Sequence, residues 1–387
     1  MINKKENSQT KVFVAMSGGV DSSVVAALLK DQGYDVVGVT MCFSINHPES
    51  KKPSCCGADG IQDAKRVAQQ LDIPHYVLDY AKDIQEYIID DFTNEYLSGR
   101  TPNPCVRCNQ FLKFGTLYEK VKALGADYLA TGHYGKIEFN DQRDCYELKK
   151  AQDQKKCQSY FLYSIKKEVL PSLLFPLGGM TKDQVRELAQ KYELNTANKP
   201  ESQDICFVPD SGYKEFIKAR VGESAFIKGS FIDQEGEVVG EHKGIANYTI
   251  GQRDKLGIAL GHPVYVYKID REQNTVYVGS KNCLYADGLI AQYFNPVSME
   301  IPKESIRVSM RIRYNAPEMS GQLKYFSDGH IEVMFDEPQM SVTPGQSVVF
   351  YEGEVVLGGA LIEKPINSAQ RSVISGQKLK VTTTENG

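Results

Sequence analysis

One seven-residue run of this chain has the composition of a phosphate-binding turn. The run SGGVDSS occupies residues 17–23 and directly follows a short apolar stretch, Val12–Met16, which we predict to be a buried strand. The residues after Ser22 are apolar and helix-forming, which predicts a helix that begins on a hydroxyl-rich turn. A strand, a glycine turn and a helix N-terminus together present unsatisfied backbone N–H groups and partial positive charge. The run is therefore a candidate anion site.

Two common phosphate motifs are absent from this run. No Lys-Ser or Lys-Thr pair closes it as in a Walker A loop, and it lacks the G-x-G-x-x-G spacing of a dinucleotide fold. Gly-Gly and Asp-Ser also occur in ordinary turns, but the complete string at a strand-to-helix junction favours phosphate. The SGGxDS pattern resembles the pyrophosphate loop of the ATP-pyrophosphatase superfamily, whose members split ATP into AMP and pyrophosphate to adenylate a carbonyl oxygen.

Three cysteines lie in polar segments that suit thiol chemistry. The segment TPNPCVRCN at residues 101–109 contains Cys105 and Cys108, and its prolines favour an extended loop before them. A helical pattern starts at Gln110, so Cys108 near a helix N-terminus and beside Arg107 is expected to ionise easily and to act as a nucleophile or metal ligand. Cys206 lies far downstream, in ESQDICF.

The chain has nine cysteines, which we do not expect to form structural disulfides in a cytosolic protein. Cys42, Cys145, Cys157 and Cys283 are predicted to be small buried residues. The adjacent pair at residues 55–56 is predicted to lie in a loop, where both thiols are candidates for reaction, and no partner for it is evident.

Strand and helix alternate over about the first 200 residues. The predicted strands after the first are residues 34–41, 74–78 and 128–131, and the predicted helices are 58–71, 84–97 and 114–124. This alternation predicts a parallel sheet with helices on both faces, in which ligands bind at the carboxyl ends of the strands. The phosphate loop, Met41 and the pair Gly132-His133 all fall at such ends, which is consistent with one nucleotide site.

From about residue 211 the pattern changes to short segments of β-branched and aromatic residues separated by glycine, which indicates antiparallel β structure. The predicted fold is an adenine nucleotide alpha hydrolase-like α/β domain, a small mixed or β domain, and an antiparallel β-barrel. The predicted boundaries are 1–10 (disordered), 11–210 (catalytic), 211–285 (central), 286–366 (barrel, tRNA-binding) and 367–387 (disordered tail).

The composition is that of a globular protein without a membrane span or signal peptide, and we expect a cytoplasmic location without a membrane partner. The net charge of −4 argues only weakly against a nucleic-acid partner, because a local basic face is sufficient. The segment 306–314 alternates apolar residues with Arg307, Arg311 and Arg313, which predicts a half-buried strand whose outer face contacts phosphate. An ordinary barrel strand is the alternative.

Five segments together resemble the tRNA-specific 2-thiouridylases, and the resemblance extends from residue 11 to about residue 363. They are SGGVDSS (17–23), TPNPCVRCN (101–109), ATGHY (130–134), QSYFL (158–162) and ESQDICF (201–207). The resemblance implies ATP-dependent replacement of O2 of the wobble uridine by sulfur in the glutamate, glutamine and lysine tRNAs. It also implies ATP and Mg²⁺ as cofactors, and a cysteine desulfurase or sulfur-relay protein as the partner that supplies sulfur.

The same resemblance implies the roles of individual residues. Cys206 carries a persulfide, Cys108 attacks it or acts on the activated base to leave a Cys108–Cys206 disulfide, and Asp21 acts in adenylation with Mg²⁺. The implied nucleotide-binding residues are Ala15, Met16, Ser17, Gly18, Gly19, Val20, Asp21, Ser22, Met41 and Gly132. The residues expected at the tRNA or target base are Asn103, Pro104, Cys105, His133, Lys156, Cys157, Gln158, Arg311, Arg313, Tyr314 and Gln346.

This chain departs from the family pattern at Cys105, where many members have Asp. Cys105, Cys108 and Cys206 could together hold a [4Fe–4S] cluster whose open iron delivers hydrosulfide. The residues leave the persulfide and cluster routes open, while no further ligand completes a zinc site. Two rival functions also stay open: another adenylating ligase acting on a small substrate, and an inactive tRNA-binding protein.

Overall fold

The first apolar run forms the middle strand of a five-stranded parallel sheet. The computed structural model describes residues 6–44, 58–201 and 205–367. The sheet has the order β3-β2-β1-β4-β7. Its strands are β1 (Lys11–Ala15), β2 (Asp35–Cys42), β3 (His75–Asp79), β4 (Tyr128–Ala130) and β7 (Leu173–Leu174). The four strands predicted for this sheet are confirmed to within one residue, and β7 was not predicted.

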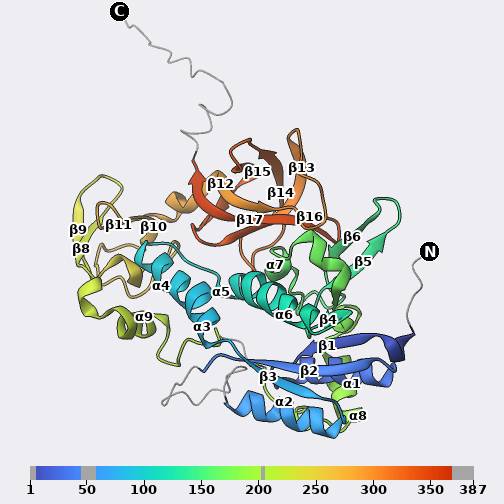
Figure 1. Cartoon of the computed structure of the whole chain (residues 1–387). Helices are drawn as coiled ribbons and strands as arrows, with labels where there is room; N and C mark the ends of the chain where they lie inside the picture. Colours follow the sequence, from blue (N-terminus) through green and yellow to red (C-terminus); the bar gives the residue numbers. More distant parts are fainter. Residues whose placement is uncertain (1–5, 45–57, 202–204, 368–387) are drawn as a thin grey trace, which may run out of the picture.

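Helices cover both faces of this sheet (Figure 1). The helices of the N-terminal unit are α1 (Val20–Asp31), α2 (Ala58–Gln70), α3 (Ala81–Ile84), α4 (Asp90–Leu97), α5 (Pro104–Arg107), α6 (Tyr118–Ala123), α7 (Ser159–Leu162) and α8 (Lys182–Lys191), of which α7 lies nearer the barrel than the sheet. Successive side chains of a strand point to opposite faces. Accordingly, Val12 and Val14 pack with α1, α2 and α8, whereas Phe13 packs with α4 and α6.

The helix that carries Cys108 begins earlier than the sequence pattern predicted. A continuous helical run starts at Pro104 with α5, continues as a π-helix over Cys108–Leu117, and ends with α6. Proline at the first position already has helical φ and lacks an N–H that would be unpaired there. The side chain of Asn103 caps the run by accepting from the N–H of Val106 at 3.3 Å. Cys108 therefore lies one turn inside the helix and not just before it.

The two β units differ in topology. The central unit contains α9 (Tyr213–Val221) and a four-stranded sheet of β8 (Gly229–Ile232), β9 (Val238–His242), β10 (Tyr265–Asp270) and β11 (Thr275–Gly279). The barrel contains β12 (Tyr285–Asn295), β13 (Ile306–Arg311), β14 (Met319–Tyr325), β15 (Ile331–Met340), β16 (Ser347–Glu352) and β17 (Val355–Ile366). Pairing of β12 with β17 closes these six strands. The predicted fold class is confirmed, while the boundaries at residues 210 and 285 stay predictions.

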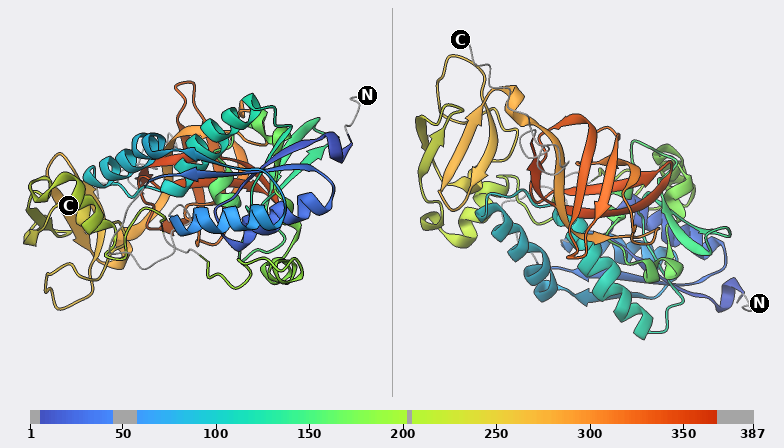
Figure 2. Two further views of the ribbon diagram at one scale, coloured as in Figure 1. Left: turned by 60° about the horizontal axis from the view of Figure 1, so that its bottom comes forward. Right: turned by 90° about the horizontal axis from the view of Figure 1, so that it is seen from above.

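Figure 1 shows the barrel on the far side of helices α5 and α6 from the parallel sheet, and Figure 2 shows the central sheet at the end of the molecule away from the N-terminus. A hairpin that the sequence did not indicate joins two of the units. It consists of β5 (Lys136–Asn140) and β6 (Cys145–Lys149), and Lys149 of β6 pairs with Val355 of β17. The N-terminal unit thus extends the sheet of the barrel.

Part of the N-terminal segment predicted to be disordered has structure, since Asn7–Gln9 form a 3₁₀ turn. The Asn7 amide donates to the carbonyl of Gln32 at 2.8 Å, which ties this turn to the end of α1. The cysteines at residues 55–56 and the tail from residue 368 lie outside the described residues. No helix in the described ranges has the length and apolar character needed to cross a membrane.

Candidate functional site

The phosphate loop has a conformation that only glycine permits. Gly18 has a φ of +73°, and a Cβ at this position would lie 2.1 Å from the carbonyl oxygen of Gly60. The hydroxyl of Ser23 donates to the Gly19 carbonyl at 2.8 Å, and the hydroxyl of Ser22 accepts from the Ser17 N–H at 3.2 Å. The loop is therefore a tight turn fixed by its own serines, with Gly19 at the N-cap of α1.

The remaining predicted nucleotide residues gather around this turn. Gly132, just after β4, is so close that a Cβ there would lie 2.9 Å from the Ser22 nitrogen. On the other side the Thr40 hydroxyl donates to the Met16 carbonyl at 2.7 Å, and Met41 follows at the end of β2. The loop, Met41 and Gly132 therefore share the carboxyl edge of the sheet, where a nucleotide would bind.

A lysine that the sequence did not single out contacts the loop. Lys182 is 7% exposed, and its Nζ lies 2.7 and 2.9 Å from the two carboxylate oxygens of Asp21. The hydroxyl of Tyr134 also donates to Asp21, at 2.8 Å. Lys182 opens α8 directly after the capping residue Thr181, so the sequence there has only the signature of a helix start. The structure adds a buried ammonium group to the candidate nucleotide site.

The same ammonium group connects the phosphate loop to the segment that leads to Cys206. Lys182 lies 3.1 Å from Glu201, whose other oxygen lies 2.6 Å from Lys156. Burial opposes ionisation of Glu201, but the hydrogen bonds from Lys156 and Lys182 outweigh it and hold the pKa below its usual 4.5. Lys199 adds a second link, since it donates to the Gly18 carbonyl at 2.9 Å.

Cys108 and Cys206 border one apolar cluster. Both are partly buried and pack against the core between the sheet and helices α4 to α6. Phe207 anchors the second cysteine, because its ring meets Phe92 of α4 edge-on at 5.2 Å. The guanidinium of Arg107, expected to act on Cys108, instead binds the Asp91 carboxylate at 2.6 and 3.2 Å. An ion pair of this kind leaves little net positive charge for the thiol.

Cys105 is exposed on α5. Among the described residues, no group of three His, Cys, Asp or Glu side chains is placed to hold a metal ion. The iron–sulfur cluster at Cys105, Cys108 and Cys206 stays a prediction.

His133 is buried in its neutral form. Burial, aided by the charge of Lys113, lowers its pKa well below 6.5. Its Nδ1 lies 2.7 Å from the Thr131 hydroxyl and its Nε2 lies 3.4 Å from the Lys113 ammonium. Because an ammonium can only donate, Nε2 accepts and Nδ1 carries the proton. His133 thus presents a fixed tautomer beside Gly132.

All three predicted tRNA contacts at residues 156–158 bond to other groups of the protein, and Lys156 is paired with Glu201 at 2.6 Å. The Cys157 side chain is 4% exposed, and its sulfur accepts from the Ala151 N–H at 3.3 Å. Gln158 exchanges hydrogen bonds with the backbone of Tyr134 at 2.8 and 2.9 Å. Gln158 therefore supports the loop that carries His133, whereas Cys157 is a buried residue bonded to Ala151.

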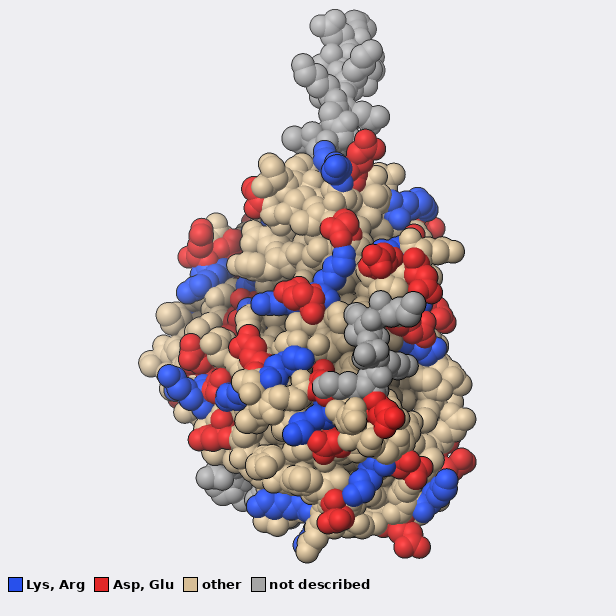
Figure 3. All heavy atoms as spheres, turned by 45° about the vertical axis from the view of Figure 1, so that its right-hand side comes forward, with Lys and Arg blue, Asp and Glu red and all other residues tan. Residues whose placement is uncertain are grey.

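The predicted basic segment contains β13, but acids from β15 and from the loop before β14 pair with two of its arginines. Arg307 lies 2.5 Å from Asp336 and Arg311 lies 3.0 Å from Glu318. Arg313 donates to the Met340 carbonyl at 3.4 Å. On the face seen in Figure 3, basic and acidic side chains are likewise interspersed. The arginine row is thus closer to an ordinary barrel strand than the sequence indicated.

Tyr314 and Gln346 both face the N-terminal unit. The Tyr314 ring lies 4.6 Å from that of Phe161, just after the start of α7. The Gln346 amide donates to the carbonyls of Thr101 and Pro102 at 2.9 and 3.4 Å, so the structure brings it to the loop before Cys105. Their predicted role in binding tRNA stays a prediction.

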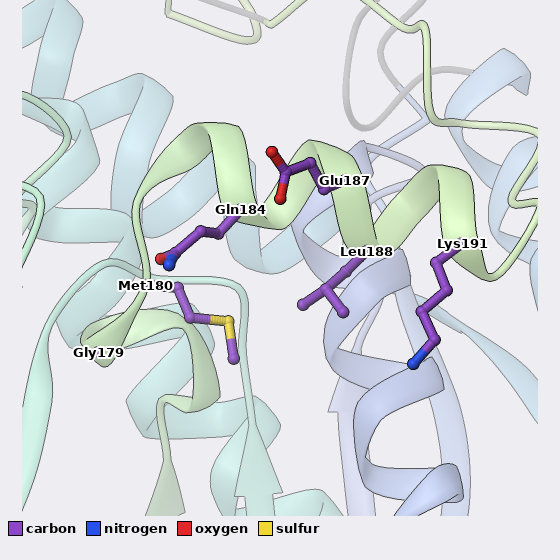
Figure 4. Close-up of a pocket in the computed structure, with 6 residues that line it drawn as sticks. All are labelled: Gly179, Met180, Gln184, Glu187, Leu188 and Lys191. Atoms are coloured by element: carbon purple, nitrogen blue, oxygen red, sulfur yellow. The ribbon is translucent and has the colours of Figure 1, made fainter.

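A separate cavity of about 580 Å³ lies along α8 (Figure 4). It is lined by Gly179, Met180, Gln184, Glu187, Leu188 and Lys191. None of these residues was predicted to bind nucleotide or tRNA, so this cavity does not coincide with the candidate site.

Three family models match the chain in succession. Residues 10–210 match the tRNA methyl transferase HUP domain, residues 214–280 the tRNA methyl transferase PRC-barrel domain, and residues 286–362 the aminomethyltransferase beta-barrel domain. The matched ranges follow the three units of the structure.

Curated relatives are similar over almost the whole chain. The tRNA-specific 2-thiouridylase MnmA of Geotalea uraniireducens (strain Rf4) is 48% identical over 94% of this chain and 98% of its own length. The protein of that name from Carboxydothermus hydrogenoformans is 49% identical over 92% and 98%. A solved structure, that of U34-tRNA thiolase NcsA from Methanococcus maripaludis with its [4Fe-4S] cluster, also matches; the match covers 56% of this chain and 68% of the NcsA chain. Its sequence identity to this chain is 18% and the TM-score is 0.33.

Proposed function

Since this chain belongs to the tRNA-specific 2-thiouridylase family, whose members transfer sulfur to tRNA uridine, we propose that it thiolates O2 of the wobble uridine in the glutamate, glutamine and lysine tRNAs. ATP supplies the activation, and AMP and pyrophosphate are released. The observation that carries the proposal is the chain of contacts from Asp21 through Lys182 to Glu201, because it links a phosphate-binding turn to the segment that precedes Cys206.

In the first proposed step the uridine O2 attacks the α-phosphate of ATP, which forms an O–P bond and breaks the bond to pyrophosphate. The α1 N-terminus at Gly19 supplies partial positive charge for the departing pyrophosphate, and Lys182 offsets the negative charge of Asp21 and Glu201 beside the loop. Asp21 is the carboxylate of the loop that would hold a Mg²⁺ ion bound with ATP, and such an ion would shield phosphate charge. Adenylation is needed because a uridine carbonyl oxygen is a poor leaving group.

In the second step the terminal sulfur of a persulfide on Cys206 reaches C2 of the base, and AMP leaves with the oxygen. Either the persulfide attacks C2 directly and Cys108 then cleaves the S–S bond, or Cys108 first attacks Cys206 and releases hydrosulfide. In both orders the S–S bond of the persulfide breaks and a Cys108–Cys206 disulfide forms. An external thiol must then reduce this disulfide with two electrons to restore the enzyme.

The proposal includes a cysteine desulfurase or relay protein as the sulfur donor and a cytoplasmic location. It is tested by charging the protein with ³⁵S from labelled cysteine and a desulfurase, followed by non-reducing electrophoresis. We expect Cys206→Ser to lose the label, and Cys108→Ser and the control Cys283→Ser to keep it. Label that persists in Cys206→Ser would contradict the assigned carrier.

A further inference from the structure

The barrel loop that contains Gln346 packs against the loop that precedes Cys105. The Gln346 amide donates to the Thr101 and Pro102 carbonyls at 2.9 and 3.4 Å, and the Thr101 N–H donates to the Pro344 carbonyl at 2.9 Å. The two hydrogens of the Gln346 NH₂ group are therefore both directed at the backbone of the N-terminal unit.

The approach of the two loops leaves no room for a side chain between them. Gly345 has a φ of +89°, and a Cβ there would lie 2.9 Å from the Thr101 carbonyl oxygen. Next to this contact, the buried Tyr160 hydroxyl donates to the Ser347 carbonyl at 2.9 Å. Backbone contact of this kind fixes position more narrowly than a contact between flexible side chains.

The residue before the loop is anchored on the barrel as well. Arg100 binds Glu95 of α4 at 2.8 Å and also pairs with Glu363 of β17. Its guanidinium donates to the Ile362 carbonyl at 3.3 Å. The side chain of Arg100 is 18% exposed, so these bonds are largely shielded from water.

We propose that Gln346 is a positioning residue: by holding the Thr101–Pro102 backbone, it sets the start of the helix that carries Cys108. The connection is short, because Asn103 follows directly and caps that helix at the N–H of Val106. The barrel then controls the geometry of the reacting thiol in addition to any tRNA contact. The inference rests on the proposed function for its catalytic consequence.

The test compares Gln346→Glu with Gln322→Glu. The first change keeps the size of the side chain but replaces two donors by an anion that the carbonyl oxygens repel. The second introduces the same charge at an exposed position of β14 on the same barrel, so it controls for repulsion of tRNA. Thermal melting followed by circular dichroism establishes that each variant is folded. If Gln346→Glu does not fold, Gln346→Ala is measured in its place.

Two readouts separate positioning from tRNA contact. The first is the rate at which iodoacetamide alkylates Cys108 without tRNA, followed by peptide mass spectrometry. The second is single-turnover thiolation at saturating tRNA, together with the dissociation constant of the tRNA. We expect the alkylation rate of Cys108 to change about threefold or more, and the thiolation rate to fall by about tenfold to a hundredfold, while Gln322→Glu resembles the wild type.

The proposal is overturned if Gln346→Glu is alkylated at Cys108 and thiolates tRNA at the wild-type rates and only its tRNA binding is weakened. Gln346 would then be a simple tRNA contact. The alkylation readout needs no thiolation activity. A wild-type protein without thiolation would therefore contradict the proposed function, and the alkylation result would still decide the role of Gln346.

Discussion

Replacing Lys182 by Met should destabilise the N-terminal unit, because the change removes a cation shared by two partly buried carboxylates. The Lys182 side chain is 9% exposed, and those of Asp21 and Glu201 are 30% and 23% exposed. Methionine keeps most of the length of the side chain but neither charge nor donors. The contacts of the hydrocarbon stem are thus largely preserved, and the measured loss reports on the ammonium group.

The size of the loss follows from what each carboxylate retains. Breaking a fully buried ion pair costs about 3–5 kcal/mol. Here Asp21 keeps the Tyr134 hydroxyl and Glu201 keeps Lys156, and both carboxylates are partly hydrated. We therefore expect about 2–3 kcal/mol, which for a unit of this size corresponds to a melting temperature lower by about 4–12 °C.

The measurement is thermal unfolding followed by far-ultraviolet circular dichroism, since the chain has no tryptophan for fluorescence. Lys191→Met makes the same chemical change at an exposed position of α8 and should shift the melting temperature by less than about 2 °C. Equal shifts for the two variants would refute the assignment of Lys182 as a structural counter-charge. Glu201→Gln in the Lys182→Met background should restore part of the loss.

Three further changes test the loop and its partners. Gly18→Ala should lower the free energy of chemical unfolding by about 2–4 kcal/mol, because it adds strain at positive φ and a Cβ 2.1 Å from the Gly60 carbonyl oxygen. A decrease of less than about 0.5 kcal/mol would contradict the turn described above. Asp21→Asn should abolish thiolation while tRNA binding in a filter assay stays near the wild type, and lost binding would count against the role of Asp21. Because the pKa of Glu201 is lowered, its ion pairs stabilise the fold above pH 4.5 and are lost as the pH falls below that value. The free energy of unfolding should therefore differ between wild type and Glu201→Gln at pH 7, and this difference should shrink below pH 4.5. A difference that does not change with pH would argue against the ion pairs.

Much of the fold follows from local patterns that the sequence displays directly. The strand of residues 12–16, the glycine turn and the following helix are recognisable because burial on both faces requires continuous apolar residues and the turn requires glycine. The barrel and the central sheet follow from the short segments of β-branched and aromatic residues, separated by glycine, after residue 211. The position of Gly132 and Met41 beside the phosphate loop follows from the rule that the carboxyl ends of parallel strands lie at one edge of the sheet.

What could not be predicted depends on contacts between distant residues. Lys182 lies in an ordinary helix start, and its burial arises only when α8 packs beside α1. In the sequence the arginines of β13 have no acid beside them. The acids that pair with them, Glu318 and Asp336, lie in other segments and approach only in the fold. The helix start at Pro104 was placed too late because apolar periodicity begins only after the proline and its cap.

The most direct test of the account is thiolation of a glutamate tRNA transcript by iron-free protein. The reaction contains ATP and a persulfide-charged cysteine desulfurase, and the product is detected by its retardation in a mercury-containing gel. We expect a retarded band that depends on ATP, Cys108 and Cys206. A band that forms only after iron and sulfide are restored would contradict the persulfide route and support a cluster, and no band in either state would contradict tRNA thiolation itself.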